Sequence, residues 1–146
     1  MTDLTDPFLM RGQSVLASQP FSVLLGAELS QFAPGHAELR MPVRAELLQQ
    51  HGFVHGGVLA YLADNALTYA GGSSLAGQIV TAEMKINYVR PAVGELLIAR
   101  ATAISSGRSQ AVARCDVFVV KDGVEKLCAA AQGTIAASRP AAQSQE

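Results

Sequence analysis

The second half of the chain alternates apolar and polar residues with the period of two that is typical of β-strands. Residues 79–89 show it most clearly, with apolar side chains at positions 80, 82, 84, 86 and 88 and polar side chains at 81, 83, 85 and 87. Residues 95–105, 110–120 and 124–137 are further strand candidates, and Asp122-Gly123 marks a hairpin turn between the last two. We expect residues 124–137 to close the sheet.

The first half of the chain predicts two helical regions and a hairpin. Apolar residues follow Pro7 at roughly helical spacing, which predicts an amphipathic helix over residues 7–18. Pro20 then begins a short turn or single helical turn. Two alternating runs within residues 27–43 flank the turn dipeptide Pro34-Gly35 and predict a hairpin. Residues 44–54 are irregular.

A longer helix is expected over about residues 57–71. It is too apolar and too rich in alanine for a wet surface, so we expect an antiparallel sheet to wrap around it in an α+β domain. Such a sheet leaves strand edges and a back face to be covered, which favours a homo-oligomer. The 146 residues fit one domain, expected over residues 1–136, followed by a disordered tail over residues 137–146.

Composition narrows the possible partners. Only 16% of the residues are charged, which again suggests surface buried between subunits, and the formal charge of -1 gives no general attraction for nucleic acid or anionic membranes. The N-terminus lacks the bases of a signal peptide, and no stretch approaches the roughly 20 apolar residues that span a bilayer. We therefore expect a cytoplasmic protein whose two cysteines, Cys115 and Cys128, are free core thiols.

The long helix has two distinct faces at about 100° per residue. The face expected in the core comprises Val58, Leu59, Leu62, Ala66 and Tyr69. The other is small and comprises Gly57, Ala60, Tyr61, Asp64, Thr68 and Gly71. Its single charge, Asp64, suits a catalytic base in a partly dry cleft. A solvated aspartate or an ion-pair partner fits the same periodicity, so the pattern alone leaves both interpretations open.

Three residues, His55-Gly56-Gly57, open this helix. Helix N-termini present unpaired N–H groups and partial positive charge, and glycines allow a carbonyl oxygen or oxyanion to approach closely. A tight turn that needs positive φ is an equally good explanation. Gly56 and Asp64 lie eight residues apart, or about 12 Å along a helix axis at ~1.5 Å per residue. A reaction that uses both groups on one carbonyl therefore needs Asp64 from a second subunit.

Three segments together resemble one known family. Residues 47–66 (LLQQHGFVHGGVLAYLADNA), 80–92 (VTAEMKINYVRPA) and 105–123 (SSGRSQAVARCDVFVVKDG) are similar to the hotdog-fold acyl-CoA thioesterases of the phenylacetate-degradation (PaaI) type. The resemblance runs from about residue 20 to 136. It implies the hotdog fold, in which an antiparallel sheet wraps a long central helix, an acyl-CoA substrate, and a homodimer or a homotetramer built as a dimer of dimers.

The resemblance also implies roles for individual residues. Asp64 matches the catalytic carboxylate of the family, and the backbone N–H of Gly56 matches its oxyanion donor, with His55 shaping the turn. In the family these two groups come from facing subunits. Thr81 matches a Ser or Thr that helps orient the attacking water. The match departs at Gln49, where relatives often carry an Asn whose side chain helps hold the thioester or the water.

Basic residues matter for a substrate that carries coenzyme A. Arg90 and Arg108 lie near strand ends, and the second sits in the loop Ser106-Gly107-Arg108-Ser109, whose N–H groups and hydroxyls suit phosphate. The resemblance implies that the nucleotide lies near these residues. A plain hairpin loop with a solvated Arg108 is the other interpretation.

Other chemistry finds little support in the sequence. His51 and His55 have a spacing that aligns metal ligands only on a helix, Gly52 and Gly56 disfavour one, and no third histidine is near. We expect no metal and no cofactor. The chain has no Gly-x-Ser-x-Gly elbow, and no Gly-Lys-Ser/Thr follows the glycine pair, which excludes serine-hydrolase and P-loop motifs.

Three functions follow in order of support. The first is an acyl-CoA thioesterase acting on an aromatic or medium-chain acyl group, held near Gly57 in an apolar interface pocket lined by Tyr61 and Tyr69. The second is a hotdog module that binds acyl-CoA without turnover, which Gln49 leaves open and Asp64 opposes. The third is a hydratase or dehydratase of acyl thioesters, which needs a His with an Asp or Glu in an arrangement that the sequence does not display.

Overall fold

The computed structural model describes residues 6–138. Its helices are α1 (Pro7–Ala17), α2 (Pro20–Leu25) and α3 (Gly56–Gly72), and Ala45–Leu47 forms a 3-10 turn. Its strands are β1 (Glu28–Ala33), β2 (His36–Pro42), β3 (Ile79–Tyr88), β4 (Leu96–Ser106), β5 (Gln110–Lys121) and β6 (Val124–Ala137). Each predicted element is present, with ends that differ by a residue or two. The Ser138 N–H donates to the Gln78 carbonyl, and the rest of the expected tail lies outside the described residues.

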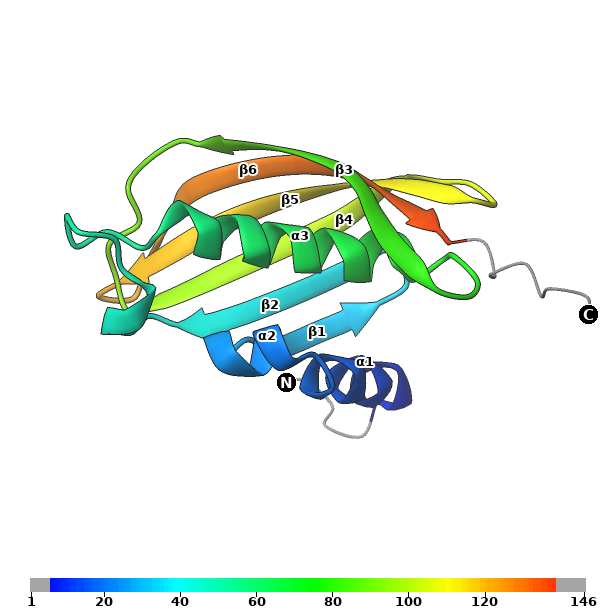
Figure 1. Cartoon of the computed structure of the whole chain (residues 1–146), viewed down its shortest axis with the longest axis horizontal. Helices are drawn as coiled ribbons and strands as arrows, with labels where there is room; N and C mark the ends of the chain where they lie inside the picture. Colours follow the sequence, from blue (N-terminus) through cyan, green and yellow to red (C-terminus); the bar gives the residue numbers. More distant parts are fainter. Residues whose placement is uncertain (1–5, 139–146) are drawn as a thin grey trace, which may run out of the picture.

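The six strands form one sheet in the order β1-β2-β4-β5-β6-β3, with every neighbouring pair antiparallel. Helix α3 lies across the concave face of this sheet, while α1 and α2 lie beside β1 and β2 (Figure 1). The expectation that residues 124–137 close the sheet is wrong. A tight hairpin pairs β6 with β5, so the far side of β6 is left for β3, and β3 becomes the edge strand.

Small residues let α3 approach the sheet closely. The predicted core face of the helix is buried, as are the alanines that face it from the sheet: Ala37, Ala99, Ala101, Ala113 and Ala129. Gly71, expected on the open face, is also buried. It faces Ile135 on β6, and a Cβ at Gly71 would lie 3.0 Å from the Ile135 Cγ1 atom. At Gly72 a Cβ would lie 2.0 Å from the Ile79 Cδ1 atom. A larger residue at Gly72 would therefore require the end of the Ile79 side chain to move.

Strand β3 changes phase near its start. Its pairing with β6 shifts between Thr81 and Glu83, which is a β-bulge. After the bulge Met84 and Ile86 pack against the core, as the sequence alternation predicts, but before it Ile79 and Thr81 are the partly buried residues and Val80 is 52% exposed. The bulge therefore turns Thr81 toward α3, whereas an unbroken alternation would point it away.

Both cysteines are buried and free, as predicted. Burial raises the pKa of Cys115 to about 12 and that of Cys128 to about 11. Neither thiol is therefore a nucleophile at neutral pH. Within residues 6–138, no helix is long and apolar enough to cross a bilayer.

The outer face of the sheet carries a buried carboxylate, Glu38. The Ser30 hydroxyl donates to its Oε1 atom at 2.7 Å, and the Arg40 and Arg100 guanidinium groups contact its two oxygens at 2.8 and 2.9 Å. Burial raises the pKa of Glu38, but these hydrogen bonds outweigh it and hold the pKa below its ordinary value. Arg100 also forms a bidentate pair with Glu125, which links β2, β4 and the start of β6.

We predict that Glu38→Gln lowers the free energy of unfolding by about 1–3 kcal/mol at pH 7, because it leaves two guanidinium groups without their shared carboxylate. The folded pKa is depressed, so the stabilisation is complete above the unfolded pKa and is lost as the pH falls through the folded pKa. The difference from wild type should shrink below about pH 4.3. Urea unfolding of both proteins across pH measures it. Glu46→Gln, at an exposed position outside the network, is the control, and an equal loss there would contradict the prediction.

Candidate active site

The start of α3 presents one unpaired N–H group. His55 is the N-cap residue, and its Nδ1 atom accepts a hydrogen bond from the Gly57 N–H at 2.8 Å. The Val58 N–H donates to the His55 carbonyl at 2.9 Å. Of the first three helical N–H groups, only that of Gly56 has no acceptor within residues 6–138. Such a group at the positive end of a helix can bind a carbonyl oxygen or an oxyanion.

Gln49 organises the loop that leads to this helix. Its N–H donates to the Phe53 carbonyl at 2.8 Å, and its carbonyl accepts from the Gly52 N–H at 3.1 Å. Its side-chain oxygen accepts from the His51 N–H. Gly52 adopts φ +83°, a conformation that favours glycine. The loop thus provides a donor for the side-chain oxygen of Gln49 and leaves its side-chain NH₂ group available as a donor.

A pocket of about 400 Å³ lies at the helix start, and we call it the helix-start pocket. Its lining includes Gln49, Gly56 and Arg90, three residues that the sequence analysis singled out as candidates. Tyr88 also lines it, and its hydroxyl donates to the Gly56 carbonyl at 3.1 Å. Sequence reasoning missed Tyr88, because its place in the strand alternation gave it an ordinary structural explanation.

Asp64 lies two turns along α3, where β3 passes the helix. The Thr81 hydroxyl donates to its Oδ1 atom at 2.6 Å. The Thr68 hydroxyl lies 3.1 Å from that of Thr81 and 2.9 Å from the Asp64 carbonyl oxygen. Among the described residues, no side chain donates a hydrogen bond to the second carboxylate oxygen or forms an ion pair with it. Thr81 thus fixes the orientation of the carboxylate and leaves one oxygen available for water.

The two groups remain separate within one chain. Gly56 opens α3, and Asp64 follows eight residues later on the same rigid helix, so about 12 Å of helix axis lie between them. The chain therefore carries two half-sites, one with the N–H donor and one with the carboxylate.

Tyr61 contacts α2 and not the pocket that the sequence assigned to it. Its hydroxyl bonds to Ser22, and the Asn65 amide donates to it at 3.0 Å. Burial raises the pKa of Tyr61, the bonds from Ser22 and Asn65 offset part of this, and the Asp64 charge adds to the rise. Tyr61 therefore connects α3 to the N-terminal helices.

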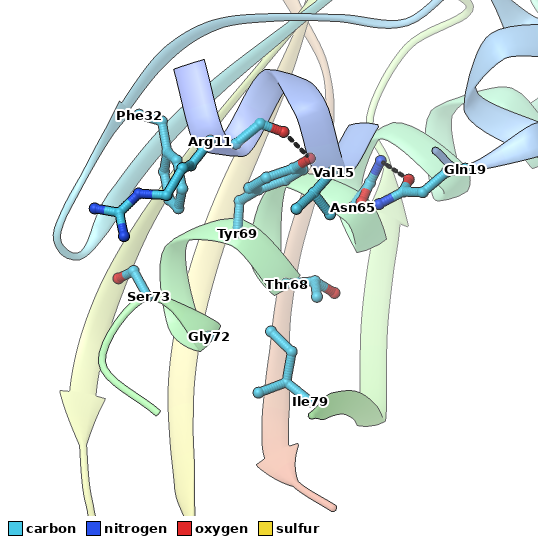
Figure 2. A pocket seen from close by; sticks show the side chains of 11 residues that line it. Arg11, Val15, Gln19, Phe32, Asn65, Thr68, Tyr69, Gly72, Ser73 and Ile79 are labelled. Atoms are coloured by element: carbon cyan, nitrogen blue, oxygen red, sulfur yellow. Dashed lines mark hydrogen bonds between the residues drawn. The ribbon is translucent and has the colours of Figure 1, made fainter. Parts of the chain in front are cut away.

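Tyr69 lines a pocket of about 370 Å³ between α1 and α3, here called the α1–α3 pocket (Figure 2). Phe32 packs edge-on to Tyr69 with ring centroids 5.1 Å apart. The Tyr69 hydroxyl donates to the Gly12 carbonyl at 2.8 Å, and burial raises its pKa to about 12. Thr68 lines the same pocket, so the pocket reaches the Thr68–Thr81–Asp64 chain of hydrogen bonds.

Three basic side chains meet beside the helix-start pocket. Arg90, Lys121 and Lys126 line a pocket of about 290 Å³, here called the basic pocket, and it shares Arg90 and Pro91 with the helix-start pocket. Sequence reasoning missed the two lysines, which the β5–β6 hairpin brings into the same pocket as Arg90. The predicted loop of Gly107, Arg108 and Ser109 lies in the β4–β5 hairpin, at the opposite end of the sheet from the start of α3 (Figure 1).

The histidines give no sign of a metal centre. His55 caps α3, and His51 is exposed in the preceding loop. Over the described part of the chain, no three His, Cys, Asp or Glu side chains gather in a metal-binding arrangement.

Comparison with known proteins agrees with this geometry. Residues 51–126 match the model of the thioesterase superfamily. The acyl-coenzyme A thioesterase PaaI of Escherichia coli is 34% identical over 89 residues, which cover 60% of this chain and 63% of PaaI. A thioesterase family protein from Silicibacter pomeroyi superposes with a TM-score of 0.83 at 34% identity, covering 88% of this chain and 96% of that one. A mutant of the phenylacetic acid degradation protein PaaI from Thermus thermophilus gives a TM-score of 0.72 at 35% identity, covering 82% and 100%.

These matches confirm the hotdog fold and the PaaI-type resemblance that the sequence motifs indicated. The family match spans the start of α3, Asp64, Thr81 and the β5–β6 hairpin, and so includes both half-sites. The chain therefore belongs to the thioesterase superfamily and is a PaaI-like enzyme of the hotdog fold.

Proposed function

We propose that the protein is a cytoplasmic acyl-CoA thioesterase that hydrolyses an aromatic or medium-chain acyl-CoA to the free acid and CoA. The observation that carries the proposal is the pair of half-sites. One presents the unpaired Gly56 N–H in a pocket, and the other presents a carboxylate with one free oxygen. An N–H donor and a base are the two groups that thioester hydrolysis requires.

A second copy of the chain completes the site in this proposal. Within residues 6–138, strand β3 is an edge strand of ten residues that pairs on one side only. Antiparallel pairing of two β3 edges would continue the sheet and place two α3 helices side by side in opposite directions. The start of one helix would then lie near Asp64 of the partner subunit. Two such dimers can associate further into a homotetramer.

Catalysis follows from these positions. The thioester carbonyl oxygen accepts a hydrogen bond from the Gly56 N–H, with the Gln49 amide as a second donor, and Asp64 of the partner subunit takes a proton from water. The water oxygen bonds to the carbonyl carbon, the C–S bond breaks, and the proton passes from Asp64 to the departing thiolate. In a second route, Asp64 attacks the carbonyl carbon and expels the thiolate, and water then hydrolyses the anhydride. Thr81 positions the carboxylate in both routes.

The remaining pockets accommodate the two ends of the substrate. We propose that the acyl group enters the α1–α3 pocket beside Tyr69 and that the CoA phosphates lie in the basic pocket. Lys121 and Lys126 thereby join Arg90, while Arg108 could reach the nucleotide only from the partner subunit.

We expect Asp64→Asn to lower kcat/KM by at least about 10²-fold for every acyl-CoA that the wild type hydrolyses, because the amide cannot accept the proton. Release of free thiol from aromatic and aliphatic acyl-CoAs measures this. Asp116→Asn, on the outer face of β5, is the matched control. Binding of the panel without any hydrolysis by the wild type would instead support the non-catalytic binding module.

Gly56→Pro should remove the oxyanion donor and leave the helix intact. Proline is favoured at the first helical position, and His55 already has the extended conformation, φ -59° and ψ 135°, that a following proline needs. We expect about a 10²- to 10³-fold loss of kcat. Gly56→Ala keeps the N–H, and its Cβ would make an ordinary contact of 3.4 Å with Tyr88, so it should retain activity.

Refolding equal amounts of Gly56→Pro and Asp64→Asn together should then restore activity, because a mixed dimer contains one intact site. Random pairing gives about a quarter of the wild-type rate, since about half of the dimers are mixed and each has one of two sites. No recovery, with mixed dimers detected by mass spectrometry, would show that the two groups do not meet across the interface.

The double variant Lys121→Ala/Lys126→Ala should raise KM for acyl-CoA about tenfold and leave the KM for the matching acyl-pantetheine unchanged, because only the former carries the nucleotide phosphates. Steady-state kinetics at low salt measure both constants. Arg108→Ala is the comparison. A rise in KM confined to that variant would place the phosphates at the β4–β5 hairpin instead.

A further inference from the structure

We infer that the α1–α3 pocket binds an acyl group with an apolar body and a negatively charged far end, and that Arg11 selects for that charge. The inference rests on the proposed function, because it concerns the acyl group of the same thioester. It narrows the substrate class to acyl-CoAs that carry a terminal carboxylate.

The pocket runs along α3 from the turn that follows Asp64. Thr68, one turn beyond Asp64, lines it, as do Gly72 and Ser73 at the end of the helix. Eight residues separate Asp64 from Gly72, which is about 12 Å of helix axis. An acyl chain that starts at Asp64 therefore has its far end near the last turn of α3.

The middle of the pocket is apolar. Phe32 and Tyr69 form one wall, and Val15 and Ile79 contribute aliphatic surface (Figure 2). Cavities of roughly 150 Å³ lined by apolar side chains bind benzene, so the 370 Å³ of this pocket accommodates a ring or medium chain with a further substituent.

Each neutral polar side chain of the pocket makes at least one hydrogen bond within the described residues, whereas the charged Arg11 makes none. Gln19 and Asn65 lie at one end, and their side chains hydrogen-bond to each other at 3.2 Å (Figure 2). Ser73, at the other end, accepts from the Gly35 N–H and donates to the Ala70 carbonyl, both at 2.8 Å. Arg11 lies at the same end as Ser73 (Figure 2), and none of the residues 6–138 provides an acceptor or a counter-charge for its guanidinium.

Among residues 6–138, Arg11 is also the single charged residue in the lining. Arg11 is exposed to solvent, but its guanidinium can still bind a carboxylate through two parallel hydrogen bonds. A neutral acyl group would leave this charge as it is now, while a terminal carboxylate would pair with it. The arrangement therefore favours an anionic acyl end over a neutral one of the same shape.

The test compares matched acyl-CoA pairs: suberyl-CoA with its terminal amide, and para-carboxyphenylacetyl-CoA with its carboxamide. Wild type should prefer the carboxylate in at least one pair by about fivefold or more in kcat/KM, the range of a partly exposed ion pair. Arg11→Met should abolish the preference by lowering kcat/KM for the carboxylate alone, and Arg11→Lys should retain part of it. Arg114→Met, at an exposed arginine on β5, should leave it unchanged.

Three outcomes would overturn the inference while leaving the proposed function intact. They are hydrolysis of both members of each pair at equal rates, a preference that survives in Arg11→Met, and an equal loss for carboxylate and amide in that variant. The last would mean that Arg11 contacts the CoA moiety common to all substrates. Absence of hydrolysis for every acyl-CoA, neutral or charged, would instead contradict the proposed function itself.

Discussion

The close fit between α3 and the concave sheet is the constraint on which the rest of the molecule depends. Alanines on the strands and glycines in the last turn of the helix bring the two so near that a methyl group added at Gly72 would displace the Ile79 side chain. Burial of apolar surface is the dominant favourable contribution to folding. In a close-packed interior, a change in the volume of one side chain also strains its neighbours. The sheet leaves α3 uncovered at its N-terminus and along the side that faces β3 and α1. Each of the residues that form the two half-sites lies at one of these openings.

A local irregularity in β3 then determines what faces the helix. Without the bulge, the strict alternation of the strand would direct Thr81 to the outer face and Val80 toward Asp64. With it, the Thr81 hydroxyl donates to the carboxylate, and Thr68 supports the same pair from the helix. One extra residue in an edge strand thus replaces an apolar neighbour of Asp64 with a hydrogen-bond donor. Bulges beside functional side chains commonly re-aim them in this way.

Much of this architecture could be predicted from the sequence because it depends on local pattern. Period-two segments and turn dipeptides gave the strands, and the apolar, alanine-rich run around Asp64 gave the central helix. The glycine pair located the helix start, and the motif around it located Gly56, His55 and Gln49. The strand order could not be predicted in this way, because β3 pairs with β6 although β4 and β5 lie between them in the sequence. The bulge at Thr81 also left no sign, since the alternation of residue types continues across it without a break.

Sequence reasoning missed Lys121, Lys126 and Arg11 for the same reason, because contacts between distant segments bring them to their pockets. Arg90 joins Lys121 and Lys126 through the pairing of β5 with β6, and Arg11 reaches α3 through the packing of α1 on β1. These side chains are far apart in the sequence and unremarkable in their own segments. Sequence spacing identifies candidate groups along one helix or loop, such as Gly56 and Asp64. Groups that line one pocket from several elements become visible only when the elements are placed.

The separation of Gly56 from Asp64 has a consequence for how activity and assembly are related under the proposed mechanism. A rigid helix cannot bend its first N–H toward its own ninth residue, Asp64, so a monomer holds both groups and completes no site. Two helices in opposite directions would bring each start to the other's carboxylate, and the unpaired edge of β3 offers the contact that could hold them so. An exposed edge of ten residues is ordinarily an aggregation hazard. In the proposed dimer the same edge would bring the two half-sites together. The protein would then need an unpaired β3 edge for activity, despite the risk of aggregation.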